Sequence, residues 1–275
     1  MTVTMNTDDE SCELFSRMIG VITEDDLAEL KTKSIAVVGL GDVGVNHAET
    51  LARMGVGGIY LADIDGEYLD KNDPLGCGRE WRESAKQLEQ RLLMINPSVR
   101  IQVFNNTSFE ALFDCVDLVC DAMDYVAIDL RSRMYSIARN QGLDVVISSP
   151  VGFGASLHIF TPQGMSFDTF FSLQADDSFE EKMSKFGSGL TPSHLYLGYQ
   201  EAADIDFTHQ KSGALGSSCL LASTLTGYSC LMQLLSKQSF KAAPFCYQID
   251  LFASKFEELC LPDGVAGLDL EVDRF

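Results

Sequence analysis

The chain has 275 residues, 46% of them hydrophobic, and its 40 acidic against 20 basic side chains give a formal charge of −20. This composition suffices for a sizeable core, and the negative charge argues against a broad nucleic-acid interface because such a surface repels phosphates. No apolar run reaches the roughly 18 residues of a membrane span, and the N-terminus MTVTMNTDDESCELF lacks the features of a signal peptide, so we expect a soluble, cytoplasmic protein without a membrane partner.

Strands and helices are predicted to alternate along the first 150 residues. Residues 1–12 are polar, and we expect them to be disordered. Helical spacing runs from Glu13 to Thr32, and Thr23 followed by Glu24–Asp26 is typical of a helix start. Short apolar runs predict strands at Ser34–Gly39, Gly58–Asp63, Val99–Phe104, Val116–Cys120 and Val145–Ser148. Helical patterns lie at Val43–Met54, Ser84–Met94 and Ile128–Asn140, with a loop at Gly66–Gly78.

The second half of the chain has a different pattern. A strand at Ser156–Phe160 is followed by an aromatic-rich excursion with short helices, Phe167–Tyr199. Ser217–Leu235 is apolar on most sides and predicts a buried helix. Tyr247–Phe252 and Lys255–Leu261 indicate a hairpin that turns at Ala253-Ser254. We therefore predict an α/β fold with a Rossmann-like, doubly wound, mostly parallel sheet and an antiparallel C-terminal extension, built as one domain over residues 13–275.

A glycine-rich turn between the first strand and its helix is the main functional signal. Gly39-Leu40-Gly41-Asp42-Val43-Gly44 fits G-x-G-x-x-G, where glycines let backbone N–H groups approach phosphate at a helix N-terminus. Asp63 ends the next strand and could accept hydrogen bonds from ribose hydroxyls. The pattern predicts a nucleotide site, although such a turn could also serve helix–sheet packing alone.

Asp42 is unexpected inside this turn. A carboxylate close to a triphosphate repels it. We expect Asp42 to cap the following helix by accepting N–H bonds from its first turn.

Cysteines and histidines do not form a metal-binding pattern. The eight cysteines contain no C-x-x-C pair, and the four histidines have no ligand spacing, so no zinc site is expected. Cys219 stands at the start of a helix, where the helix dipole could favour its thiolate; buried packing is the alternative.

Several segments together resemble one family, the ThiF/MoeB/HesA adenylyltransferases, which are relatives of ubiquitin-activating enzymes. The segments, in chain order, are FSRMIGVITEDDLAELKTKSIAVVG, DIDGEYLDKND, Ile95-Asn96-Pro97, VCDAMDYVAIDLRSR and SGALGSSCLLASTLTGYSCLMQLL. The resemblance covers roughly residues 13–262. SSPVGFGASLHIF and TPQGMSFDTFF resemble the subset of this family that lacks the zinc cysteines.

The resemblance implies an ATP- and Mg²⁺-dependent enzyme that adenylates a carboxylate, such as the C-terminus of a ubiquitin-like protein, a peptide or a small molecule. It implies a nucleotide half at about 13–150 and an acceptor and dimer half at about 151–275. In the implied homodimer, Arg17 reaches the partner's triphosphate. Asp124 matches the catalytic Mg²⁺-holding acid, with Asp121 as the alternative ligand; either acid could instead cap a helix. The implied nucleotide-binding residues are Gly39, Gly41, Asp42, Gly44, Asp63, Asp65, Lys71 and Arg82.

The sequence also departs from the family pattern. Lys71 and Pro74 stand where the family has Asn and Arg, and Ser84 stands where it has Lys; Arg79, Arg82 or Lys86 could supply the missing charge. These losses leave a second hypothesis, a catalytically degenerate homodimer that acts as a scaffold or binding module. A third, an NAD-dependent oxidoreductase, shares the glycine turn and Asp63 but has no use for Arg17 or Asp124.

Overall fold

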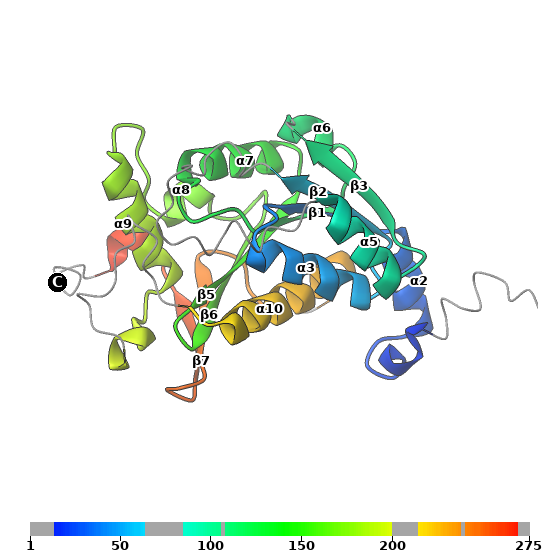
Figure 1. Ribbon diagram of the computed structural model, residues 1–275. Helices are drawn as coiled ribbons and strands as arrows, with labels where there is room; N and C mark the ends of the chain where they lie inside the picture. Colours follow the sequence, from blue (N-terminus) through cyan, green and yellow to red (C-terminus); the bar gives the residue numbers. More distant parts are fainter. Residues whose placement is uncertain (1–13, 64–84, 106–107, 200–213, 238–239, 269–275) are drawn as a thin grey trace, which may run out of the picture.

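The computed structural model describes residues 14–63, 85–105, 108–199, 214–237 and 240–268. It contains an eight-stranded sheet in the order β3-β2-β1-β4-β5-β6-β7-β8 (Figure 1). The strands are β1 (Ser34–Val38), β2 (Gly58–Asp63), β3 (Arg100–Asn105), β4 (Leu118–Asp121), β5 (Asp144–Val151), β6 (Gly154–Phe160), β7 (Phe245–Asp250) and β8 (Lys255–Cys260). The first five strands are parallel, and the last three join antiparallel. The predicted fold class is confirmed.

Helices cover both faces of the sheet. One face carries α3 (Asp42–Arg53), α5 (Ala85–Ile95) and α10 (Gly216–Leu234), and the other carries α6 (Phe109–Phe113), α7 (Ile128–Asn140) and α8 (Phe167–Phe170) (Figure 1). Each face has its own buried apolar cluster, because the strands between them bury side chains on both sides. The second half of the chain also contains α9 (Phe179–Leu190) and the 3₁₀ turns η3 (Leu195–Gly198) and η6 (Gly264–Gly267).

The antiparallel extension grows from β5, which is longer than the predicted strand. Residues 148–151 continue β5 beyond the end of β4 and pair with β6. The predicted boundary between the two halves, at about residue 150, therefore falls inside one strand, and the segments on both sides of it belong to one sheet. The predicted hairpin of β7 and β8 is present, but its turn covers residues 251–254 rather than Ala253-Ser254 alone, because β7 ends at Asp250; Ser254 has a φ of 54°.

The N-terminal segment differs from the expectation of one helix over Glu13–Thr32. A 3₁₀ turn, η1 (Ser16–Met18), is separated from α2 (Glu24–Thr32) by Gly20, whose φ of 104° is incompatible with a continuous helix. The predicted start of α2 is confirmed, since Thr23 and Asp26 form a reciprocal capping box.

Two further observations complete the fold. The short helix α6 was absent from the sequence prediction; Ser108 caps it, and Phe109, Leu112 and Phe113 anchor it in the core. In the described part of the chain, no helix combines the length and apolar character that crossing a bilayer requires.

Candidate functional site

The glycine turn connects the carboxyl end of β1 to α3 and is closely packed. Gly39 has a φ of 96°, and a Cβ there would lie 2.3 Å from the carbonyl oxygen of Ala122. A Cβ on Gly44 would lie 2.0 Å from the carbonyl oxygen of Gly39. Neither position can therefore hold a larger residue. By contrast, a Cβ on Gly41 would meet no atom of the described residues within 4 Å, so these residues leave open space beside Gly41 that a ligand could enter.

The N-terminus of α3 faces this space. Gly41 is the N-cap residue and has no side chain to satisfy the first-turn N–H groups, which therefore remain available to an anion. The prediction that Asp42 caps the helix is wrong. Asp42 lies within the first turn, and in the described residues its carboxylate accepts no hydrogen bond there; only its carbonyl is engaged, by Asn46 Nδ2 at 2.8 Å.

A buried ion pair lies at the carboxyl end of β4, the strand next to β1. Asp121 Oδ2 accepts hydrogen bonds from Arg131 Nε at 2.8 Å and from the Tyr135 hydroxyl at 3.0 Å. Asp121 Oδ1 accepts the Met123 N–H at 3.0 Å, and Arg131 Nη2 donates to the Met123 carbonyl at 2.7 Å. Both carboxylate oxygens of Asp121 are thus engaged inside the protein, and this geometry does not favour Asp121 as a metal ligand.

Asp124 lies in the same loop, between β4 and α7, and is half-buried. Its Oδ1 accepts the Val126 N–H at 3.3 Å, and its carbonyl accepts the Ala127 N–H at 3.1 Å. Among the described residues, no group of three His, Cys, Asp or Glu side chains could hold a metal. A Mg²⁺ ion at Asp124 would therefore need water or phosphate oxygens as further ligands, as is usual for this ion.

The other predicted nucleotide residues are only partly described. Asp63 is the last residue of β2, so its backbone reaches the same sheet edge as the glycine turn. Asp65, Lys71 and Arg82 lie outside the described residues, so their predicted roles stay predictions. Lys86, one of the proposed substitutes for the missing charge, is exposed near the start of α5.

Arg17 lies far from the glycine turn of its own chain. It is exposed on η1 next to Phe15, whose ring packs near Gly55 just after the end of α3. The glycine turn lies before the start of α3, and the 12 residues of this helix span about 18 Å. Figure 1 shows η1 at the opposite end of α3 from the turn. Arg17 is therefore not part of the glycine-turn site of its own chain.

Cys219, in the first turns of α10, is not activated. Burial, and secondarily the charge of Asp42, raise its pKa above the ordinary value. The expected effect of the helix dipole is therefore outweighed, although Cys219 is half-buried rather than fully buried. Asp42 lies in the first turn of α3, and α3 packs against α10.

His47 holds these two helices together. Its Nδ1 lies 2.8 Å from Ser223 Oγ, and its Nε2 lies 3.2 Å from Thr226 Oγ1. Complete burial lowers the pKa of His47 from 6.5 to about 3, so the ring is neutral. The helix that follows the glycine turn is consequently fixed against the C-terminal helix.

Two residues of the site were missed from the sequence, Arg131 and Tyr135. A signal for Arg131 was present: it falls in the apolar stripe of α7 with Ile128, Met134 and Ala138. A charged residue in such a stripe requires a buried partner.

The comparison with known proteins identifies the family. The sequence pattern of the ThiF family matches residues 15–264. The chain belongs to the ThiF family. Membership supports adenylation of a carboxylate as the class of reaction. No curated protein matches the sequence.

Solved structures resemble this ThiF-family protein at low identity. A PaaA crystal structure matches with a TM-score of 0.57 and 13% identity, covering 94% of this chain and 85% of PaaA. The microcin C7 biosynthetic enzyme MccB in complex with N-formylated MccA matches with a TM-score of 0.59 and 14% identity, covering 87% and 67% of the two chains. E. coli MccB with ATP matches with a TM-score of 0.58 and 13% identity, covering 86% and 65%. At this identity the likeness shows the fold.

Proposed function

We propose that the protein is an ATP-dependent adenylyltransferase that activates a carboxylate as an acyl-adenylate. The observation that carries the proposal is the open space that the described residues leave beside Gly41. This space lies at the N-terminus of α3, which no side chain caps. The strand that leads into the glycine turn, β1, pairs with β4, which leads into the Asp124 loop. Backbone N–H groups and a helix N-terminus are suited to phosphate. The ThiF-family assignment, and the solved structure of MccB with ATP, support a nucleoside triphosphate as the phosphate donor.

The reaction would proceed mainly by positioning and charge neutralisation. The turn at Gly39–Gly44 would hold the phosphates, and Asp63 would accept bonds from the ribose hydroxyls. An oxygen of the acceptor carboxylate would attack the α-phosphorus, forming a new O–P bond while the bond to pyrophosphate breaks. Asp124 would hold Mg²⁺, which supplies neutralisation of phosphate charge when bound. The ion pair of Asp121 and Arg131 would fix the backbone of the loop that carries Asp124.

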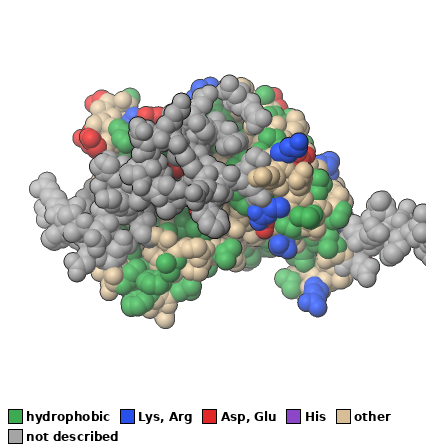
Figure 2. Space-filling model, in the orientation of Figure 1, with side chains coloured by type: hydrophobic (Ala, Val, Ile, Leu, Met, Phe, Trp, Pro, Cys, Tyr) green, Lys and Arg blue, Asp and Glu red, His purple; other side chains and the backbone are tan. Residues whose placement is uncertain are grey.

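The working unit we propose is a homodimer in which Arg17 contributes to the partner's site. A guanidinium suits charge on phosphate oxygens. Around Arg17, three apolar side chains are exposed that a second subunit would cover: Leu14, Ile19 and Val21, the last 88% exposed. A further hydrophobic patch gathers near β7 and the start of α10 (Figure 2). Leu220 on α10 and Leu251 and Phe252, directly after β7, are exposed.

The acceptor we propose is the carboxylate of a ubiquitin-like protein, a peptide or a small molecule, in the cytoplasm where ATP is supplied. The complex of the structural neighbour MccB with N-formylated MccA supports an acceptor of the peptide kind.

Calorimetry with Mg·ATP tests the nucleotide part of the proposal without knowledge of the acceptor. We expect micromolar binding. Pyrophosphate exchange into ATP, assayed with candidate carboxylates, then tests the chemistry, and Asp124→Ala should abolish exchange. Asp129→Ala, which removes an exposed acid of α7, is the matched control and should leave it intact. Exchange that survives Asp124→Ala would contradict the role given to Asp124.

A degenerate scaffold is the second candidate, and the position of Asp42 favours it. The carboxylate lies in the first turn of α3, beside the space where phosphates would enter. Absence of Mg·ATP binding together with a stable dimer would support the scaffold over the enzyme.

A further inference from the structure

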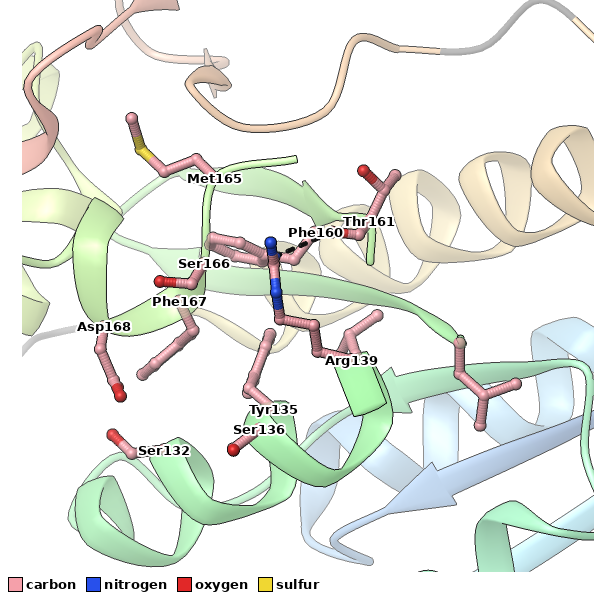
Figure 3. A pocket seen from close by; sticks show the side chains of 12 residues that line it. Ser132, Tyr135, Ser136, Arg139, Phe160, Thr161, Met165, Ser166, Phe167 and Asp168 are labelled. Atoms are coloured by element: carbon pink, nitrogen blue, oxygen red, sulfur yellow. Dashed lines mark hydrogen bonds between the residues drawn. The ribbon is translucent and has the colours of Figure 1, made fainter. Parts of the chain in front are cut away.

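A cavity lies at the opposite edge of the sheet from the glycine turn. This cavity, of about 250 Å³, is enclosed by α7, the amino end of β5, the carboxyl end of β6 and the start of α8 (Figure 3). Because β1, β4 and β5 are parallel, the start of β5 and the glycine turn belong to opposite edges. The cavity is smaller than the roughly 300–1,000 Å³ of pockets for drug-sized ligands, so it suits a small metabolite rather than a nucleotide.

The floor of the cavity is rigid and apolar. Tyr135 and Phe167 stack with ring centroids 4.2 Å apart, and Phe160 meets the Tyr135 ring edge-on at 5.2 Å. All three side chains are buried. The Tyr135 hydroxyl is engaged by Asp121, so this ring has a fixed orientation. Such a floor provides a surface for aliphatic or aromatic carbon atoms.

One cationic group borders the cavity with unused donors. Arg139 Nη1 donates to the carbonyls of Gly164 at 2.9 Å and Thr161 at 3.4 Å, which fixes the position of the guanidinium. A guanidinium has five N–H donors, and those on Nε and Nη2 have no protein acceptor in the described part of the chain. Figure 3 shows the Arg139 side chain crossing the cavity in front of Phe160. Its geometry is suited to a carboxylate.

An anionic group lines the other side. Asp168, in the first turn of α8, is exposed and forms no ion pair among the described residues. In Figure 3 it lies beside Ser132, on the opposite side of the cavity from Arg139 and Thr161. Two opposite charges thus border one small space without neutralising each other. A ligand that carries both a carboxylate and an ammonium group would satisfy both.

We propose that this cavity binds a free α-amino acid. The carboxylate lies against the Nε and Nη2 donors of Arg139, the ammonium group lies against Asp168 and the Ser132 hydroxyl, and the side chain lies on the floor formed by Tyr135, Phe160 and Phe167. The site does not depend on nucleotide binding or on adenylation.

The experiment is a thermal-shift screen of the full chain with each standard L-amino acid, without ATP, followed by calorimetry on the strongest binder. We expect at least one amino acid to raise the melting temperature. Its amide, which lacks the carboxylate charge, and its deaminated acid, which lacks the ammonium group, should each bind about tenfold more weakly or worse.

Variants distinguish this cavity from other surfaces. Asp168→Asn should lower the affinity for the amino acid about tenfold but leave the affinity for its deaminated acid unchanged. Asp176→Asn, an exposed acid outside the cavity, is the matched control and should change neither. Arg139→Gln should lower the affinity for both ligands. Its control is Arg133→Gln, which changes an exposed arginine on the same helix. Because Arg139 also holds the loop at residues 161–164, Asp168→Asn is the decisive variant.

Two results would overturn the proposal. One is that no standard amino acid binds at millimolar concentration. The other is that the best binder has the same affinity for Asp168→Asn as for the wild-type protein.

Discussion

Arg131 Nε donates to Asp121 Oδ2 at 2.8 Å, and the side chains of both residues are almost completely withdrawn from solvent. The same two residues hold the N–H and the carbonyl of Met123, immediately before Asp124. The ion pair therefore fixes the backbone of the loop on which we propose the metal-holding acid.

Removing one partner of this pair should destabilise the fold strongly. Arg131→Met leaves the Asp121 charge buried without its counter-ion, and the free energy of unfolding should fall by about 3–5 kcal/mol. Urea unfolding measures this change in the free energy of unfolding. Lys182→Met, which breaks an ion pair with the exposed Asp129, is the control and should lose less than about 1 kcal/mol. The double variant Asp121→Leu, Arg131→Met should lose less free energy of unfolding than the two single variants lose together. Additive losses would show that the pair does not act as a unit.

Removing the charge of Asp42 should strengthen nucleotide binding. In general, two like charges about 8 Å apart repel by about 0.5–2 kcal/mol at an effective dielectric constant of about 20–80. Asp42→Asn should therefore bind Mg·ATP about tenfold more tightly in calorimetry. The control is Asp25→Asn, which removes a first-turn acid from α2 instead. Unchanged affinity in Asp42→Asn would mean that the phosphates do not lie at this helix end.

Arg17 should act between subunits. Arg17→Ala and Asp124→Ala should each lack pyrophosphate exchange, while a mixture that has exchanged subunits should recover about a quarter of wild-type activity, because half of the dimers contain one intact site. An inactive mixture in which mixed dimers are demonstrated would exclude the arrangement in trans.

Acid should destabilise the protein through His47. Its folded-state pKa of about 3 lies below the ordinary 6.5, so the unfolded chain takes up the proton first. The contribution of the neutral His47 ring to the free energy of unfolding is fully present above about pH 6.5. It is lost as the pH falls towards 3, by at most about 1.4 kcal/mol per pH unit. His158, whose pKa burial lowers to about 4, adds a similar contribution. The free energy of unfolding should differ less between pH 6 and pH 5 in His47→Gln than in the wild type. An equal difference would contradict a buried neutral ring.

Much of the fold could be predicted because its signals are local and periodic. The bounds of β2 and α7 coincide with the predicted Gly58–Asp63 and Ile128–Asn140. Prediction failed where a single residue decides the local backbone. Gly20 interrupts the expected N-terminal helix through its positive φ. The capping role given to Asp42 failed because α3 begins at Asp42 itself, with Gly41 as its N-cap.

The site was less accessible to prediction because its contacts join distant segments. Arg131 stands in an apolar stripe, but its partner Asp121 is known only once α7 folds back over β4. The orientation of Arg17 relative to α3 likewise depends on how Phe15 packs near Gly55. The roles of Asp63, Asp65, Lys71, Arg82 and Asp124 remain predictions.

The contact of His47 with Ser223 joins residues 176 positions apart in the chain. During synthesis at about 5–20 residues per second, about 10–35 s pass between translation of these two residues. A nascent chain therefore has its glycine turn long before the helix that supports it, and the His47 contacts can form only after α10 has been synthesised.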